Sequence, residues 1–245
     1  MATARASATT PSAEATVGMA IILFGSPGAG KGTQARKIAA RYQISQVSTG
    51  DMIREEIRSG SSLGVQVEAT LAAGGLVDDE SVNRLVEARL KSEDCRRKGF
   101  LLDGYPRTGG QARALSELLK RMDCQPVVIE VKVGYNEIVR RITGRRLCSQ
   151  CGAIYNVFSN PPKISDVCDV CGHRPLTVRS DDRAEVVEER FRVYQEETMP
   201  VFDVFRSAGD TVHQVDGTRP ENEVAGLIFE ILEAERTHDH PQKSV

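Results

Sequence analysis

Nine residues near the start of the sequence have the types and spacing of a phosphate-binding loop. The stretch GSPGAGKGT (residues 25–33) follows an apolar run over residues 20–24 and precedes a helical pattern over residues 34–42. Glycines let successive backbone N–H groups point into one concavity that suits an anion. The helix N-terminus adds partial positive charge, and Lys31 supplies a mobile cation. This strand–turn–helix pattern predicts binding of a nucleoside triphosphate.

The loop departs from the usual pattern G-x-x-x-x-G-K-[ST] at one position. Gly32 stands where a magnesium-binding hydroxyl is usual, and Thr33 follows one residue later. The alternative interpretation is an ordinary glycine-rich turn with a chance lysine. The strand before the loop and the helix after it favour the phosphate-binding interpretation.

Two further segments place charged residues beside predicted strand ends or helix starts. STGDMIR (residues 48–54) opens a helix capped by Ser48 or Thr49, and Arg54 one turn inside makes a second anion site. A plain capped helix with a solvated arginine is the alternative.

GFLLDGYPR (residues 99–107) is an apolar strand that ends in Asp103, where a magnesium-organising carboxylate belongs. An aspartate that only caps the next helix is the alternative there.

Four of the six cysteines form two C-x-x-C pairs, each followed by glycine. The pairs are Cys148 with Cys151 and Cys168 with Cys171, and sixteen residues separate them. This spacing predicts a closed structural Cys₄ zinc site with no open position for catalytic water. A redox pair and a nucleic-acid zinc ribbon are the rival interpretations. Cys95 and Cys124 stand alone, as expected of intracellular thiols.

Composition excludes other classes of protein. A net charge of −2 over 245 residues argues against a nucleic-acid binder held by bulk electrostatics. No apolar stretch approaches the roughly 18 residues of a membrane span, so we expect a soluble, cytoplasmic protein. Residues 1–18 have no apolar periodicity, and we expect a disordered extension or a start misassigned before Met19. A transit peptide, and hence an organelle, is the alternative.

The alternation of apolar runs and helical patterns predicts an α/β fold with a doubly wound parallel sheet. Two short helices with glycine ends, inserted after the second strand, are typical of a mobile subdomain. Strands are expected at residues 20–24, 44–48, 99–103, 127–133 and 211–215. Helices are expected at residues 34–42, 49–60, 64–73, 81–90, 109–122, 136–144 and 221–235, with a long charged helix after residue 182.

Six motifs together resemble the nucleoside monophosphate kinases, and within them the long-lid, zinc-containing adenylate kinases. They are GSPGAGKGT, STGDMIR, LDGYPRT with Gln111, ITGRR, the two cysteine pairs and LTVRSDD, and the likeness runs from Met19 to about Ala234. The resemblance implies a P-loop kinase core over residues 19–245. It also implies two mobile inserts, an NMP-binding arm near residues 48–77 and a zinc-knuckle lid near residues 144–181.

The resemblance further implies reversible transfer of the terminal phosphoryl group of ATP to AMP, giving two ADP. Mg²⁺ would accompany ATP, and Zn²⁺ would be structural. The protein would act as a monomer on ATP, AMP and ADP, without a nucleic-acid or membrane partner.

Roles follow from the resemblance residue by residue. The implied ATP site comprises Gly28, Ala29, Gly30, Lys31, Gly32 and Thr33 at the phosphates, with Arg145, Ile154 and Tyr155 near the base and Arg219 beyond. The implied AMP site comprises Thr49, Arg54, Gly75, Leu76, Val77, Gly104, Tyr105, Pro106, Arg107, Gln111, Arg179 and Arg190. The implied catalytic set is Lys31, Asp103, Arg107, Arg141, Arg145, Arg179 and Arg190, with Arg141, Arg145, Arg179 and Arg190 converging on the transferring group. The implied metal ligands are Cys148, Cys151, Cys168 and Cys171.

Two alternatives remain at this point. A sibling kinase could use another base, either a pyrimidine monophosphate or GTP as donor. The long lid argues against a pyrimidine kinase, because that group resembles this chain with a short lid. Thr49 in STGD, rather than an alanine at that position, also favours AMP. A non-enzymatic P-loop switch or zinc-ribbon module is the other alternative. The sequence has no N-K-x-D motif for a switch, and its charge does not suit nucleic acid.

Overall fold

The computed structural model describes residues 18–239, so nearly all of the extension expected over residues 1–18 lies outside the described residues. Its centre is a five-stranded parallel sheet in the order β2-β3-β1-β4-β7. The strands are β1 (Met19–Phe24), β2 (Ser45–Ser48), β3 (Gly99–Asp103), β4 (Pro126–Lys132) and β7 (Val212–Asp216). All four pairings are parallel, as the alternation of strands and helices predicts.

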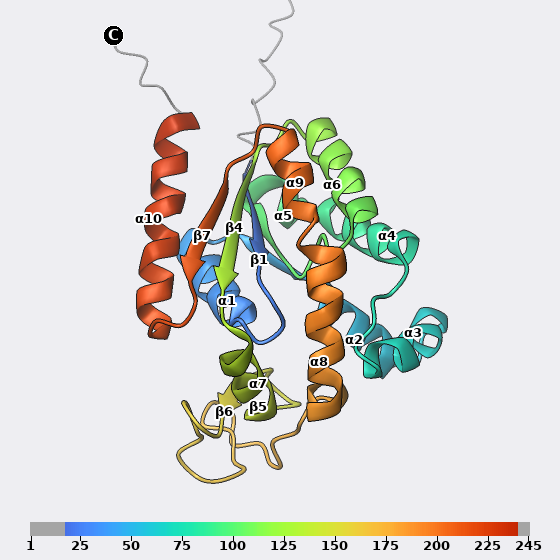
Figure 1. Ribbon diagram of the computed structural model, residues 1–245, viewed down its shortest axis with the longest axis vertical. Coiled ribbons are helices and arrows are strands. Elements are labelled where there is room, and N and C mark those ends of the chain that lie inside the picture. The colour runs from blue at the N-terminus through green and yellow to red at the C-terminus, as the bar shows by residue number, and fades with distance from the viewer. Residues whose placement is uncertain (1–17, 240–245) are drawn as a thin grey trace, which may run out of the picture.

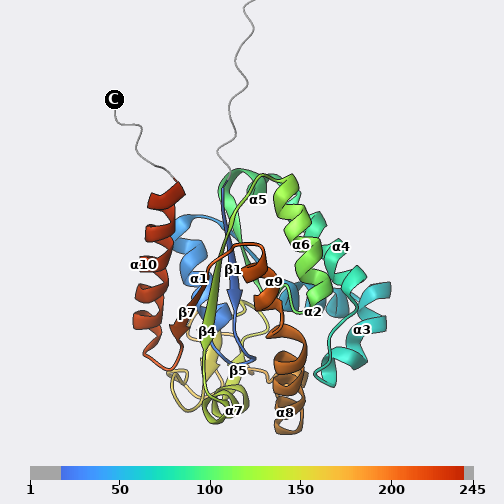
Figure 2. The same cartoon turned by 45° about the horizontal axis from the view of Figure 1, so that its top comes forward.

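Each central strand is apolar on both sides because helices cover both faces of the sheet. Ile22 and Leu102 face one core with α4 (Asp79–Leu90), α6 (Gly109–Arg121) and α9 (Val201–Ser207). Ile21 and Leu101 face a second core with α1 (Lys31–Tyr42) and α10 (Glu221–Asp239). Figure 1 shows the two layers, and Figure 2 shows α1 and α10 together on one side of the sheet. Helices on both faces of a parallel sheet confirm the predicted doubly wound α/β fold.

Two inserts project from the carboxyl-terminal edge of the sheet. The first contains α2 (Thr49–Ser59) and α3 (Ser62–Ala72), which pack on each other. The second follows α7 (Tyr135–Thr143) and contains the antiparallel hairpin of β5 (Arg145–Leu147) and β6 (Ile154–Asn156). The strand arrows in Figure 1 point toward this second insert at the bottom of the view.

The structure differs from the predicted elements at several boundaries. Helix α3 begins at Ser62 because the Ser61 hydroxyl caps it, accepting from the Gly64 N–H at 3.0 Å. Ser48, rather than Thr49, caps α2. The charged helix expected after residue 182 is α8 (Ala184–Val193), which runs through a π-helical turn at Tyr194–Thr198 before α9 begins.

Short elements were missed by the sequence analysis. They are α5 (Glu93–Lys98), the 3₁₀ turn at Ser180–Asp182, the β5–β6 hairpin and α9. Each is too short for hydrophobic periodicity to distinguish it from a loop. Among residues 18–239, no helix is both long enough and apolar enough to span a lipid bilayer.

Truncation of one buried strand residue tests this packing. Leu102 lies on β3 between Ile22 and Val47 and is fully buried. We expect Leu102→Ala to lower the free energy of unfolding by about 2–5 kcal/mol, because it removes buried methyl groups and leaves a cavity. Urea denaturation measures the change. Val65→Ala, at a side chain that is 69% exposed on α3, is the control and should stay within about 0.5 kcal/mol of wild type. Equal effects at the two positions would contradict the assigned core.

Candidate active site

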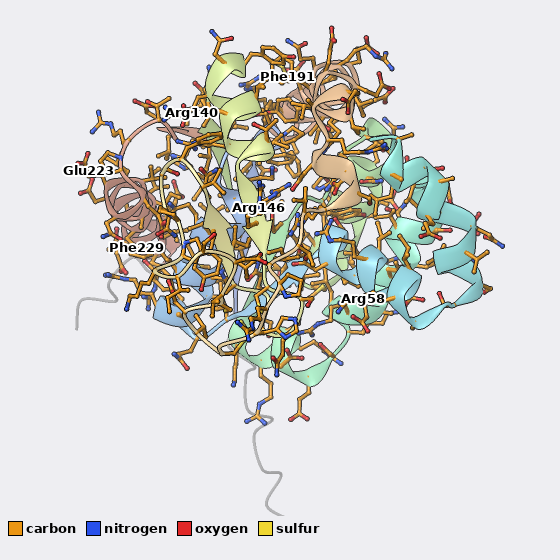
Figure 3. The ribbon with its side chains drawn as sticks, turned by 90° about the horizontal axis from the view of Figure 1, so that it is seen from below. Arg58, Arg140, Arg146, Phe191, Glu223 and Phe229 are labelled. Carbon is orange, nitrogen blue, oxygen red and sulfur yellow. The ribbon has the colours of Figure 1, made fainter. Side chains whose placement is uncertain are left out.

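A large cavity of about 1370 Å³ lies at the carboxyl-terminal edge of the sheet. Its walls come from the phosphate-loop segment, the α2–α3 insert, the end of β3 and the hairpin insert. Figure 3, seen from below, shows the hairpin insert lying across the molecule, between α10 with Glu223 and Phe229 and α2 with Arg58. Ligands of open parallel sheets bind at this edge, where the strand order reverses.

The loop after β1 has the backbone geometry of an anion nest. Gly28 has φ of 79°, and a Cβ there would lie 2.8 Å from Ile142 Cγ1, so glycine is required. The Lys31 ammonium folds back over the loop and donates to the carbonyls of Gly25 at 2.7 Å and Ser26 at 3.0 Å. Burial lowers the pKa of Lys31 to about 8, against the attraction of Asp103. A bound phosphate would further stabilise the charged form.

Asp103 ends β3 directly beside this loop. A Cβ at Gly32 would lie 3.5 Å from Asp103 Oδ2, so the carboxylate occupies the side of the loop where the usual serine or threonine would project. Burial raises the pKa of Asp103, while the Lys31 charge opposes that rise. A carboxylate oxygen next to a phosphate nest is the donor that Mg²⁺ prefers. The residues present therefore fit a magnesium ion held between Asp103 and nucleotide phosphates.

A cluster of arginines faces Lys31 from the opposite walls. The side chains of Arg145, Arg179 and Arg190 are only 15–16% exposed. Burial lowers the pKa of Arg107 to about 10, and the charge of Arg190 adds to the effect. Burial likewise lowers the pKa of Arg179 to about 10, with Arg145 adding to it. So many cations withdrawn from water require anionic partners.

Two adjacent carboxylates supply part of that compensation. Asp182 is fully buried and accepts from Arg145 Nε at 2.6 Å and from Arg190 Nη1 at 3.0 Å. Asp181 lies 3.1 Å from Arg190. Burial opposes ionisation of Asp181, but the arginines, Arg190 first, hold its pKa below the usual value. The sequence alone assigned these carboxylates no role, although both belong to the LTVRSDD motif that contains Arg179.

The two inserts meet across the cavity through Asp51. This carboxylate accepts from Arg54 Nη2 at 2.6 Å on its own helix and lies 3.8 Å from Arg179 of the hairpin insert. The predicted second anion site at Arg54 is thus occupied by a protein carboxylate. The ion pair of Asp51 with Arg179 brings the two inserts into contact at one edge of the cavity.

The end of β3 and the start of α6 position Arg107. Its Nε donates to the Gly104 carbonyl at 2.8 Å, and Thr198 Oγ1 donates to the Arg107 carbonyl at 3.0 Å. Thr49 Oγ1 donates to the same Gly104 carbonyl at 2.7 Å. The buried Thr198 belongs to the π-helical turn between α8 and α9. Its hydrogen bond therefore connects this turn to Arg107.

The structure brings most of the predicted AMP-site residues to the cavity. Those that line it are Thr49, Arg54, Gly75, Leu76, Val77, Gly104, Arg107, Gln111, Arg179 and Arg190. Tyr105 and Pro106 are buried behind the wall instead. The Tyr105 hydroxyl donates to Asn83 Oδ1 at 2.7 Å, so its role is to pack α4 against this loop.

The predicted donor-site residues also line the cavity. Lys31, Arg145, Ile154 and Arg219 are among them. Tyr155 lines the cavity, and its hydroxyl lies 3.4 Å from Cys168 Sγ. Arg141, a predicted catalytic residue, also lines the cavity. It donates to the carbonyls of Ala29 at 3.3 Å and Gly217 at 2.9 Å and pairs with Glu137, because its place on α7 faces the phosphate loop.

The four predicted cysteine ligands form one cluster. The Sγ atoms of Cys148, Cys151, Cys168 and Cys171 all lie within 4.8 Å of one another, the only such group found among residues 18–239. Two of the separations are 3.5 Å, near the ~3.8 Å that tetrahedral Zn–S bonds of ~2.3 Å require. The Tyr155 bond lowers the pKa of the Cys168 thiol, whereas the neighbouring thiols raise the pKa of Cys171, so the four sulfurs share protons when no metal is bound. The residues present fit a zinc ion.

Fold and site together define a class of protein. A phosphate loop at the end of β1, a carboxylate at the end of β3 and facing arginines are the parts that P-loop phosphotransferases use to hold and transfer a phosphoryl group. The cavity is wide enough for two nucleotide-sized ligands, which is typical of nucleotide kinases in this class.

Comparison with known proteins specifies the family. The adenylate kinase family model matches residues 23–210. The adenylate kinase of Archaeoglobus fulgidus is 46% identical over 88% of this chain and 98% of its own length. The adenylate kinase of Caldanaerobacter subterraneus subsp. tengcongensis is 45% identical over 90% of this chain and 99% of its own length. The adenylate kinase of Fervidobacterium nodosum is 44% identical over 87% of this chain and 97% of its own length. The chain belongs to the adenylate kinase family.

Loss of one cysteine ligand tests the metal site. We expect the purified protein to hold about one equivalent of zinc and Cys148→Ser to lower the melting temperature, because the hairpin insert has only a small apolar cluster of its own. The turnover rate at 20 °C should stay within a few fold of wild type, because no ligand belongs to the arginine cluster. Calorimetry, metal analysis and turnover measure these effects. Loss of metal and turnover together while the insert stays folded would contradict a structural role.

Proposed function

We propose that the enzyme transfers the terminal phosphoryl group of ATP to AMP and forms two molecules of ADP. An oxygen of the AMP phosphate forms the new P–O bond, and the bond between the γ-phosphorus and the β,γ-bridging oxygen of ATP breaks. The transfer is reversible, because one ADP can return its terminal phosphoryl group to the other, so the enzyme would equilibrate adenine nucleotides. The family membership supports a nucleotide kinase, and the substrate pair is our inference.

The observation that carries the proposal is one cavity lined by two groups of cations, which would bind two phosphate-bearing ligands. Lys31 and the phosphate loop form the first, and Arg54 and Arg107 form the second. Arg145, Arg179 and Arg190 lie between them. Phosphoryl transfer passes through a loose transition state with charge on the equatorial oxygens, so positioning and electrostatic stabilisation provide the catalysis. No general base is required, and none is assigned.

Each side chain contributes through its charge. Lys31 would bind the outer phosphates of ATP, and the arginine forks would bind the transferring group and the AMP phosphate. Asp103 would hold Mg²⁺, which neutralises the phosphate charge when it is bound. Asp182 accepts from Arg145 and Arg190, and Asp181 pairs with Arg190, so these two carboxylates hold the arginine forks in place.

The two inserts serve as an NMP-binding arm over residues 48–77 and a lid over residues 144–181 in this proposal. Water near the γ-phosphate would hydrolyse ATP, so both inserts must close over the pair of nucleotides. The contact between Asp51 and Arg179 supports such closure. The zinc cluster would let the lid move as one body without contributing a catalytic residue.

A kinase that uses another base is the second candidate, because the base contacts are the least specified part of the cavity. A coupled assay with AMP, GMP, CMP and UMP as acceptors and ATP and GTP as donors separates the candidates. We expect the pair of ATP and AMP to give the highest kcat/KM.

Lys31→Ala should lower kcat for that pair by more than tenfold, because the lysine stabilises charge in the transition state. A preferred pyrimidine acceptor, or a tenth of wild-type activity retained in the variant, would contradict the proposal.

The pKa of Lys31 predicts how the rate depends on pH. An ordinary lysine stays charged to about pH 10, but this one has a pKa of about 8 in the free enzyme. We therefore expect kcat/KM for ATP to fall by about tenfold per pH unit above pH 8, because only the ammonium binds phosphate. Lys31→Arg is the control, since its guanidinium stays charged and its smaller rate should not decline between pH 7 and 9. A flat wild-type profile to pH 9 would contradict the role of this cation.

A further inference from the structure

Asp79, the first residue of α4, binds the amino-terminal turn of α6. Its Oδ1 accepts from Gln111 Nε2 at 2.9 Å. Its two oxygens lie 2.9 and 2.7 Å from the Thr108 hydroxyl. Thr108 Oγ1 in turn caps α6 by accepting from the Gln111 N–H at 3.1 Å. Gln111 lines the cavity, whereas Asp79 lies behind it.

The Gln111 side-chain amide is held at both of its polar atoms. Oε1 accepts from the backbone N–H of Arg107 at 2.8 Å, and Nε2 donates to Asp79. A backbone N–H only donates and a carboxylate only accepts, so these partners allow one orientation of the amide. Rotation by 180° would set oxygen against the Asp79 carboxylate and N–H against the Arg107 N–H. Gln111 is only 2% exposed, so water cannot compensate for that mismatch.

The held amide has one N–H and one oxygen lone pair left for a ligand. Ile53, Val77 and Val82 line the same part of the cavity and provide apolar walls for a flat ring. Adenine presents an acceptor at N1 beside a donor at its exocyclic N6 amine. Guanine presents the opposite order, an acceptor at O6 beside a donor at N1–H. A freely rotating amide would pair with either base, but an amide held in one orientation distinguishes them.

We propose that Asp79 is a positioning residue that orients the Gln111 amide and thereby makes the monophosphate site prefer adenine to guanine. The inference rests on the proposed function, because it assigns the Gln111 side of the cavity to the acceptor nucleotide. Asp79 is the stronger of the two restraints, since its bond to Gln111 is charge-assisted and the Arg107 N–H is neutral. Asp79 itself makes no contact with the nucleotide.

Asp79→Asn tests the restraint with almost no change in shape. The asparagine amide can turn a donor toward Gln111, so the reversed orientation loses most of its penalty. With ATP saturating, we expect the ratio of kcat/KM for AMP to that for GMP to fall by about tenfold, the scale of one two-bond base contact. The KM for ATP should stay unchanged. An unchanged ratio, or equal losses with AMP and GMP, would overturn the proposal because either result means a purely structural contact.

Two further variants complete the test. Glu80→Gln removes a charge from the next residue of α4, where the side chain is 79% exposed and pairs with Arg84, and the ratio should not change. Gln111→Met removes the polar pair at similar volume and should lower the ratio at least as far as Asp79→Asn. If Asp79→Asn does not fold, a retained ratio in Gln111→Met still overturns the proposal. If the wild-type enzyme phosphorylates neither AMP nor GMP, the proposed function is wrong. If it phosphorylates AMP and GMP equally well, only the role of Asp79 is wrong.

Discussion

The rest of the site depends on the cost of holding several cations in one poorly hydrated space. Lys31, Arg107, Arg145, Arg179 and Arg190 surround one cavity, and burial lowers the pKa of Lys31, Arg107, Arg179 and Arg190. Such an arrangement is stable only with nearby anions, either protein carboxylates or nucleotide phosphates. The carboxylates of Asp181 and Asp182 are permanent members of this balance. The remaining positive charge is available to a ligand, and it is the physical basis of phosphate binding in this protein.

The fold delivers these charges from segments that are far apart in the sequence. The parallel sheet brings the phosphate loop and Asp103 to adjacent strand ends, because β1 and β3 are neighbours in register. The two inserts carry the arginines of the opposite wall, and α8 carries Arg190. Since the arginines sit on inserts rather than on the sheet, their distance from the phosphate loop can change when the inserts move. In the proposed function, closure of the inserts would couple the exclusion of water to assembly of the charged site.

The lid illustrates how a small segment gains rigidity without a large core. Its apolar cluster contains only Cys148, Tyr155, Cys168 and Leu176 with Ala153 beside them. Four thiols placed for a tetrahedral metal replace the hydrophobic contacts that so short a segment cannot provide. The Tyr155 hydroxyl accepts from the Asp169 N–H at 2.7 Å and contacts Cys168, so it orients one thiol as a second layer of the metal site. The hydroxyl of this cavity-lining tyrosine thus supports the metal site.

The sequence by itself determined the parts whose signals are local. The phosphate loop, the cysteine pairs, the parallel sheet and most helices follow from glycine positions, ligand spacing and hydrophobic periodicity, which adjacent residues encode. Tertiary structure alone decided which charges meet. Asp182 pairs with Arg145 across 37 positions, Asp79 with Gln111 across 32, and Arg141 turns to Ala29 across 112. A hydrogen bond between distant segments depends on side-chain direction and on how helices pack. A single sequence carries no periodic signal for either property.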